Sequence, residues 1–201
     1  MNDNWKTNST ADQTTIINDG LNLYSPGIVI ADNESILVQT LDPGIHTAIV
    51  AGAGGGTGIG LIEVYDVDTA TDGQLANIST RAQVGTGDSP LIGGFILGPD
   101  TGGVTSVVVR ALGPSLAASG VVNPLPDPIL EIANSNGEII QSNDDWASGP
   151  DAGTISADNL APTNASESAL LLSSGPGAYT TIVSGVGGTA GIGLVEIYNL
   201  E

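Results

Sequence analysis

One stretch of this chain occurs twice, and any fold must accommodate both copies. PGIHTAIVAGAGGGTGIGLIEVYDVD covers residues 43–68, and PGAYTTIVSGVGGTAGIGLVEIYNLE covers residues 176–201. Residues 31–68 align with residues 164–201 without a gap, and 17 of the 38 positions are identical. In each copy, strand-like apolar runs flank a glycine-rich connection, a pattern that predicts two strands joined in a hairpin-like return.

The repeat extends further upstream, because Asn2-Asp3-Asn4-Trp5 returns as Asn143-Asp144-Asp145-Trp146. We name the copies the first and second B segments, and we name the unduplicated stretch between them segment A. The predicted organisation is a half module (1–68, with the first B segment at 2–68), a linker (69–74) and a complete module (75–201, made of segment A, 75–142, and the second B segment, 143–201).

Glycine and proline are frequent among runs of Ile, Val, Leu and Thr, which favours many short strands joined by tight turns. We therefore predict an all-β fold of antiparallel β-sandwich modules, jelly-roll or immunoglobulin-like. Segment A also contains a predicted hairpin over 127–142 with a primed turn at Asn136-Gly137, and one helical turn at 115–120. The expected strands lie in 14–18, 27–31, 34–40, 46–52 and 60–66 of the first B segment, in 75–85, 90–98 and 104–113 of segment A, and in 167–174, 179–185 and 193–199 of the second B segment.

The charge balance narrows the choice of partners. The chain has three Lys and Arg residues in total and 22 Asp and Glu residues, so its formal net charge is -19. A protein that binds nucleic acids or anionic membrane surfaces needs basic patches, so both kinds of partner are disfavoured. Cations, sugars and other proteins are still possible partners. There is no cysteine for disulfides, and no apolar run is long enough for membrane insertion. The acidic, lysine-poor, β-rich composition predicts a secreted protein, extracellular or at the cell surface.

Several motifs together carry a resemblance: ANISTR, GGFILG, VVVRALGPSLA, DPILEI, SNDDW, ES, PGAYT and LVEIY. They resemble a β-rich module that occurs in tandem in large secreted or surface proteins of environmental bacteria. The order in that family is A then B, so the resemblance implies that 75–201 is one complete module and that 2–68 is the back half of a preceding one. It implies no enzymatic activity.

A half module exposes sheet edges and an apolar face that a stable protein must cover. The first B segment could pack on segment A of its own chain, be completed by another copy, or belong to a fragment of a longer protein. We favour another copy, which would give a head-to-tail homo-oligomer or fibre. The predicted interface residues are Ile62, Val64, Glu63, Tyr65, Arg81 and Arg110.

Period-two counting places Ile62 and Val64 toward the core and Glu63 with Tyr65 on the opposite face, where a neighbouring subunit, a sugar or solvent could meet them. Two arginines, Arg81 and Arg110, lie in strand-like runs. In so acidic a chain we expect each to pair with a carboxylate, within or between subunits. The candidate carboxylates are Glu131 and Glu167.

No catalytic or cofactor site is predicted. His46, the single histidine, aligns with Tyr179, and the glycine run has no nearby lysine to bind phosphate. The site-like polar motifs are the two Asx-Trp signatures, whose oxygens suit calcium, although a turn anchored by tryptophan is the favoured interpretation. The candidate calcium ligands are Asp3, Asn4, Asp144 and Asp145, while Glu34-Ser35 and Glu167-Ser168 are interpreted as capped turns.

The sequence thus predicts a non-enzymatic extracellular structural protein, a subunit of a homopolymeric fibre or surface assembly joined by half-module complementation. The alternative is an adhesin or carbohydrate-binding appendage of a larger secreted protein, with surface glycans as partners. Aromatic residues make up only 3% of the chain, which argues against a sugar-stacking groove. A hydrolase with paired acids is the third alternative.

Overall fold

A computed structural model describes residues 1–25, 28–67, 75–98 and 103–200. The chain divides into two compact units, Met1–Gln74 and Leu75–Glu201. The predicted linker, 69–74, lies outside the described residues.

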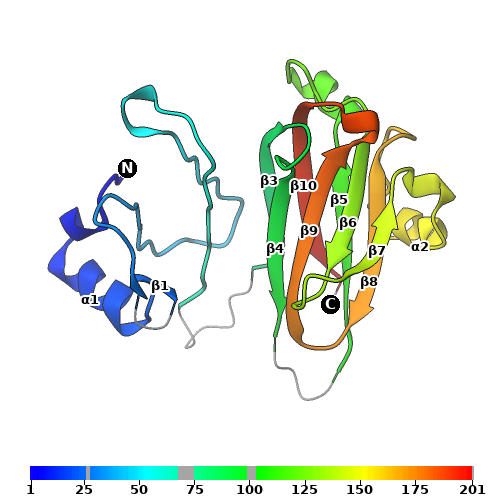
Figure 1. Ribbon diagram of the computed structural model, residues 1–201. Coiled ribbons are helices and arrows are strands. Elements are labelled where there is room, and N and C mark those ends of the chain that lie inside the picture. The colour runs from blue at the N-terminus through cyan, green and yellow to red at the C-terminus, as the bar shows by residue number, and fades with distance from the viewer. Residues whose placement is uncertain (26–27, 68–74, 99–102, 201) are drawn as a thin grey trace. The chain divides into compact units, whose positions relative to one another are not determined.

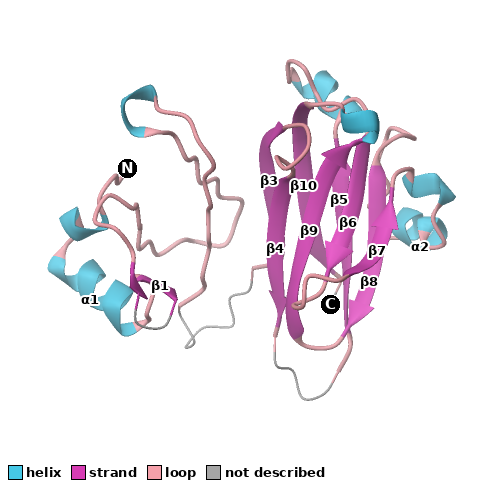
Figure 2. Cartoon of the chain, viewed as in Figure 1, coloured by secondary structure: helices cyan, strands magenta, loops and turns pink. Residues whose placement is uncertain are grey.

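The C-terminal unit is an antiparallel β-sandwich, which confirms the predicted all-β fold class (Figures 1 and 2). One sheet has the order β3-β10-β5-β8 and the other has the order β4-β9-β6-β7. All strands predicted for segment A and the second B segment are present. They are β3 (Asn77–Val84), β4 (Leu91–Leu97), β5 (Thr105–Leu112), β6 (Pro128–Ala133), β7 (Ile139–Asn143), β8 (Ser168–Ser174), β9 (Gly177–Gly185) and β10 (Gly191–Asn199).

The main core lies between the two sheets and draws on both segments. Val195 and Ile197 of β10 are buried there, as period-two counting predicts, and they pack with Val107 and Val109 of β5. Phe95 of β4 stacks on Tyr179 of β9, with ring centroids 5.4 Å apart. The core therefore exists only when segment A and a B segment fold together.

Strands of the two segments alternate across the sandwich. In the first sheet, β10 pairs with β3 and β5, and β8 pairs with β5. In the second sheet, β9 pairs with β4 and β6. Consequently none of β8, β9 and β10, the strands of the second B segment, pairs with another strand of that segment. A B segment contributes three separated strands whose backbone partners all come from segment A.

The predicted hairpin-like return of the repeat is wrong. β9 and β10 belong to different sheets, and the glycine-rich connection carries the chain across the end of the sandwich. A 3₁₀ turn, η5 (Val186–Gly188), forms this corner, with Gly187 at φ 65° and Gly188 at φ 73°. Such positive φ values favour glycine, so the glycine run serves a change of sheet.

The hairpin between β6 and β7 is confirmed, but its turn is not of the primed type. Only Gly137 has a positive φ, 79°, whereas a type I′ turn needs two such residues. The Asn134 side chain accepts hydrogen bonds from the backbone N–H groups of Asn136 and Glu138, and the register shifts between Ile132 and Ala133. An Asx-stabilised turn with one left-handed glycine therefore replaces the predicted turn.

Short helices accompany the sandwich. The predicted turn at 115–120 is the 3₁₀-helix η3 (Pro114–Ser119). The second B segment also contributes η4 (Trp146–Ser148) and α2 (Ala152–Ala157), which were not predicted. Ile155 of α2 packs with Val108 and Ala169 in a smaller core on the outer side of the first sheet, and half-buried Trp146 borders it. The Asx-Trp signature thus anchors a cap over β5 and β8.

The N-terminal unit contains η1 (Trp5–Thr7), α1 (Thr10–Asn18), β1 (Leu23–Ser25), β2 (Ile28–Val29) and η2 (Ala53–Gly55). The strand predicted at 14–18 is wrong, because these residues end α1. The Ser9 side chain accepts the Asp12 backbone N–H at 3.1 Å and caps the helix. Ile16 then turns into the unit and is completely buried. The helix cap and this burial override the strand preference of the β-branched residues.

The strands predicted at 34–40, 46–52 and 60–66 are also wrong. Apart from η2, residues 36–66 form extended loops without strand pairing (Figure 2). Val50, Ile62 and Val64 are 62%, 47% and 59% exposed. The physical reason follows from the second copy, where every equivalent strand pairs with segment A. The first B segment cannot form these strands from its own backbone.

Candidate functional site

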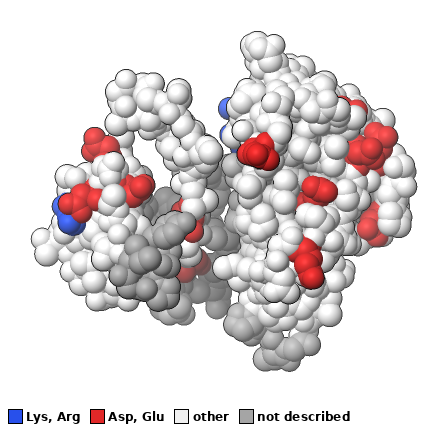
Figure 3. All heavy atoms as spheres, in the orientation of Figure 1, with Lys and Arg blue, Asp and Glu red and all other residues white. Residues whose placement is uncertain are grey.

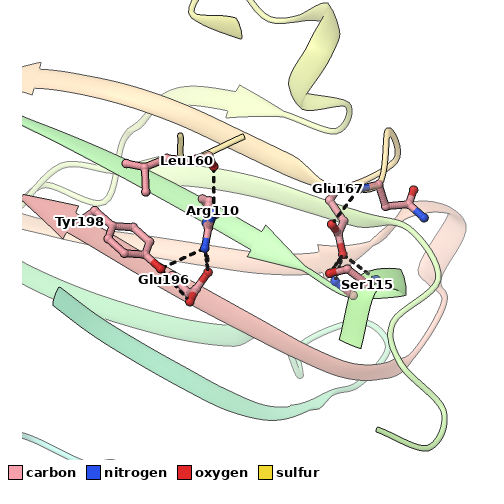
Figure 4. A network of polar contacts seen from close by, with 8 residues as sticks. Arg110, Ser115, Leu160, Glu167, Glu196 and Tyr198 are labelled. Carbon is pink, nitrogen blue, oxygen red and sulfur yellow. Dashed lines mark hydrogen bonds and ion pairs between the residues drawn. The ribbon is translucent and has the colours of Figure 1, made fainter. Parts of the chain in front are cut away.

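Two polar clusters fasten segment A to the second B segment (Figure 4). Both draw on the run RALGPS, residues 110–115, at the end of β5 and the start of η3. We call them the Arg110 cluster and the Glu167 cluster. They form the candidate site of this protein, which is a surface for joining segments.

In the Arg110 cluster, one guanidinium bonds to three residues of the second B segment. Its Nε donates to Glu196 Oε2 at 3.0 Å, and its Nη2 forms an ion pair with the same carboxylate. Nη1 donates to the Leu160 carbonyl at 3.0 Å, and Nη2 donates to the Tyr198 hydroxyl at 2.9 Å. The guanidinium carbon lies 4.9 Å from the centre of the Tyr198 ring. Two guanidinium donors that converge on one carboxylate oxygen, with the guanidinium over an aromatic ring, form a geometry that is specific to arginine.

The Tyr198 hydroxyl closes the cluster by donating to Glu196 Oε1 at 3.0 Å. Burial raises the pKa of Tyr198, the charge of Glu196 and the hydrogen bond to it raise it further, and Arg110 partly opposes them. The side chains of Arg110 and Glu196 are 15% and 12% exposed, so water screens this pair only weakly.

In the Glu167 cluster, a fully buried carboxylate satisfies the start of η3. Glu167 Oε1 accepts from the backbone N–H groups of Gly113 and Ser115, both at 2.9 Å, and from the Ser115 hydroxyl at 2.6 Å. Its Oε2 accepts weakly from Asn164 N at 3.4 Å. The interpretation as a simple capped turn missed this role because the donors lie more than fifty residues away, in segment A.

The predicted carboxylate partners, Glu131 and Glu167, were wrong for Arg110. Arg110 pairs with Glu196, whereas Glu167 binds the η3 backbone. Arg81 lies exposed on the edge strand β3, opposite Leu194. Within the described ranges, neither recorded ion pair includes Arg81. Of the two strand arginines, only Arg110 therefore fastens the two segments.

Gly191, at the start of β10, is a third point of close contact between the segments. A Cβ atom there would lie 2.6 Å from the backbone nitrogen of Leu125, in segment A. Around this contact, Leu125 N donates to the Ile192 carbonyl at 2.8 Å, and Ile192 N donates to the Asn123 carbonyl at 2.8 Å. Backbone therefore touches backbone, and only glycine fits.

Gly191→Ala is expected to destabilise the C-terminal unit by about 2–3 kcal/mol, because the clash is with backbone and cannot be relieved by a rotamer. Urea unfolding of the full chain followed by circular dichroism measures the change. Gly58→Ala, at the equivalent position of the first B segment, is the matched control, since a Cβ atom there would have nothing within 4 Å and no change is expected. Equal effects of the two substitutions would contradict the assignment.

The first B segment carries the equivalent side chains without their partners. Glu34, Glu63 and Tyr65 align with Glu167, Glu196 and Tyr198, but all three are exposed. The Tyr65 hydroxyl donates to Glu63 Oε1 at 3.0 Å, as Tyr198 does to Glu196. This hydrogen bond, with some burial, raises the pKa of Tyr65. Half of the Arg110 cluster is thus already assembled in the first copy.

Local contacts are also shared by the two copies. Trp5 N donates to the Glu34 carbonyl at 2.9 Å, and Trp146 N donates to the Glu167 carbonyl at 2.8 Å. Asn2 Oδ1 accepts from Ile36 N at 3.3 Å, and Asn143 Oδ1 accepts from the equivalent backbone N–H of Ala169 at 3.1 Å. The Asx-Trp signature therefore builds the same cap in both copies.

The candidate calcium ligands lie in these caps. Asn4 Oδ1 accepts the Lys6 N–H at 3.0 Å and caps η1, while Asp145 precedes η4. Burial and the charges of Asp145 and Asp144 raise the pKa of Asp127. Among the described residues, no group of three acidic or histidine side chains is placed to hold a metal ion. Calcium binding here stays a prediction.

If Asp144 and Asp145 bind calcium, adding a chelator should lower the melting temperature of the purified chain, and excess calcium should restore it. The matched variant Asp144→Asn/Asp145→Asn should remove this response. An unchanged melting temperature with and without chelator would leave the two residues with their turn role alone.

Two other surface features are the single histidine and an open hollow. His46, with Nε2 2.8 Å from the Asp42 carbonyl, is exposed, and an open hollow beside Arg81 is lined by no aromatic side chain among the described residues. Figure 3 shows acidic side chains scattered over the visible face of each unit. None of the helices in the described ranges is long and apolar enough to cross a bilayer.

No protein-family model and no curated protein matches this chain. The fold and the site define the class of protein: an all-β protein in which one unit is a sandwich of interleaved A and B segments and the other unit contains a further copy of the B segment.

Proposed function

We propose that this protein is a non-enzymatic structural protein of the extracellular space or cell surface. Its chains join when segment A of one chain pairs with the first B segment of another. The observation that carries the proposal is the alternation of A and B strands, because a B segment without segment A leaves three strand sequences unpaired. Unpaired backbone and exposed apolar side chains favour association with a complementary chain.

Apolar positions of the first B segment support the same conclusion. Leu37, Val50, Ile62 and Val64 are exposed by 57%, 62%, 47% and 59%, whereas their equivalents Leu170, Val183, Val195 and Ile197 are buried to 7% exposure or less. Burying a side chain of this size contributes about 1.5–3 kcal/mol. Covering the first copy as the second is covered would therefore offset much of the cost of releasing a second copy from the same segment A.

The ratio of segments sets the form of such an assembly. Each chain has one segment A and two B segments, so exchange between identical chains conserves the number of complete modules. Head-to-tail growth then depends on how strongly the first B segment competes for segment A and on chain concentration. A reversible, concentration-dependent oligomer or fibre is the expected form, with the chain itself as the partner.

Light scattering and negative-stain microscopy of the purified chain over a wide concentration range test this proposal. We expect a rising average mass and fibres with a regular repeat. Glu34→Ala/Glu63→Ala, which removes two exposed carboxylates of the first B segment, should reduce assembly without changing the stability of the sandwich. A monodisperse monomer at every concentration, or unchanged assembly of the variant, would overturn the proposal.

A further inference from the structure

We propose that the first B segment is a second docking partner for segment A of its own chain. The chain would then interconvert between the observed sandwich, made of 75–142 and 143–201, and a circularly permuted sandwich, made of 2–68 and 75–142. In the permuted form the second B segment is released. This inference goes beyond the proposed assembly, because it requires only one chain.

The first argument is that the first B segment keeps glycines whose need is explained only by contact with segment A. A Cβ atom at Gly191 would lie 2.6 Å from Leu125, and one at Gly193 would lie 2.9 Å from Val84. At the equivalent Gly58 a Cβ atom would have nothing within 4 Å, and at Gly60 it would meet only Val50, at 3.8 Å. Gly58 and Gly60 are therefore present although neither has the segment A neighbour that would exclude a Cβ atom, as Leu125 and Val84 do in the second copy.

The two carboxylates and the tyrosine that bind segment A are also present in the first B segment. Glu34 could accept the η3 N–H groups as Glu167 does, and Glu63 with Tyr65 could bind Arg110 as Glu196 with Tyr198 do. A buried arginine or a buried helix start without such acceptors would be costly. Segment A can therefore change partner and keep a carboxylate acceptor for Arg110 and another for the start of η3.

The chain connection permits this exchange. Asn77, in β3, is opposite Tyr198 in β10, and Asn199 N donates to the Ala76 carbonyl at 3.4 Å, so segment A begins where the second B segment ends. In the permuted form Tyr65 would take the place of Tyr198. Ten residues, 67–76, then connect neighbouring strands. Neighbouring strands are only about 5 Å apart, whereas ten residues can span about 33 Å.

The glycine-rich turn of the first B segment already has the conformation that the permuted sandwich requires. Gly54 in η2 has φ 64° and ψ 18°, and Gly187 in η5 has φ 65° and ψ 17°. The turn between the two strand sequences of the first B segment therefore already has the backbone conformation of η5, the turn by which the second B segment passes from one sheet to the other. Docking has to order the strands but not the corner.

Three differences explain why the observed sandwich uses the second copy. Gln39 stands where buried Leu172 lies, Ala48 replaces Thr181, whose hydroxyl donates to the Gly93 carbonyl at 2.8 Å, and His46 replaces Tyr179, which stacks on Phe95. A polar side chain in the core and a lost hydrogen bond both weaken docking. The permuted sandwich is accordingly the minor form.

Disulfide trapping tests the inference directly, because the chain has no cysteine. Gln83 is opposite Ile192 in the observed register, and Ile59 is the equivalent of Ile192. In the full chain, Gln83→Cys/Ile192→Cys should cross-link rapidly and report the observed form. Gln83→Cys/Ile59→Cys should cross-link within the same chain and report the permuted form. Gln83→Cys/Ile45→Cys is the control, since Ile45 aligns with Ala178 in the opposite sheet.

A second readout comes from giving the first B segment the residues of the second copy at two of the three differing positions. Adding Gln39→Leu/Ala48→Thr to the Gln83→Cys/Ile59→Cys variant should raise its intrachain cross-linking rate at least about tenfold, which corresponds to about 1.4 kcal/mol. An intrachain rate no higher than that of the Ile45 control, or no response to Gln39→Leu/Ala48→Thr, would overturn the inference. Cross-links found only between chains would likewise overturn it while supporting the proposed assembly.

Discussion

Glu167→Ala is expected to lower the free energy of unfolding of the C-terminal unit by about 3–5 kcal/mol. The substitution removes the carboxylate that accepts the buried N–H group of Gly113 and the part-buried N–H group and hydroxyl of Ser115. Each unsatisfied buried polar group costs about 1–3 kcal/mol. Urea unfolding of the full chain, followed by circular dichroism, measures the shift in midpoint.

Two variants sharpen this measurement. Ser115→Ala removes a single donor and should cost about 1 kcal/mol, which stays measurable if Glu167→Ala prevents folding. Glu34→Ala, the matched change in the first B segment, should leave stability unaltered because Glu34 is exposed. A wild-type midpoint for Glu167→Ala, or a comparable loss for Glu34→Ala, would refute the role assigned to the buried carboxylate.

Arg110→Ala is expected to destabilise the same unit by about 2–3 kcal/mol, because Glu196 would remain largely buried without its cation. Arg110→Lys should recover only part of this loss, since an ammonium cannot bond to Glu196, Leu160 and Tyr198 in the same fork geometry. The same urea titration measures both variants.

The control for Arg110 is Arg81→Ala, the other strand arginine of the module. Arg81 is exposed on the edge strand, so its removal should change the midpoint little. Full rescue by Arg110→Lys would mean that charge alone matters, and equal effects of Arg81→Ala and Arg110→Ala would contradict the cluster described in Figure 4.

Local patterns in the sequence predicted the features that depend on neighbouring residues. Runs of Ile, Val, Leu and Thr between glycine and proline predicted every strand of the C-terminal unit, and the residues 115–120 indicated the helical turn that is η3. The helix that includes 14–18 also has a local signal in the sequence. Ser9 and Asp12 have the spacing of a helix cap, and this signal outweighs the β-branched residues that suggested a strand.

Features that depend on partners far along the chain could not be predicted. The hairpin-like return is wrong because β9 and β10 each pair with strands of segment A, and pairing across sheets leaves no local signature. The same limit applies to the two clusters, whose members are separated by 54 residues for Glu167 with Gly113 and by 86 residues for Arg110 with Glu196. Only the sheet register shows which carboxylate each donor meets.

The two B segments of this chain separate the features that local sequence determines from those that need a distant partner. The Asx-Trp cap and the glycine corner form in both copies, because their contacts are local. The strands form only in the second copy, where segment A supplies the partners. Local sequence therefore determines the turns of a B segment, and segment A determines its strands.

Hydrogen exchange of backbone amides in the full chain at low concentration tests most directly whether B strands need segment A. Amides of β9 and β10 should be strongly protected, whereas the equivalent amides in 46–50 and 60–66 should exchange nearly as fast as in an unstructured peptide. Equal protection of the two sets in a monomeric sample would show that the first B segment forms these strands without segment A and would contradict the account.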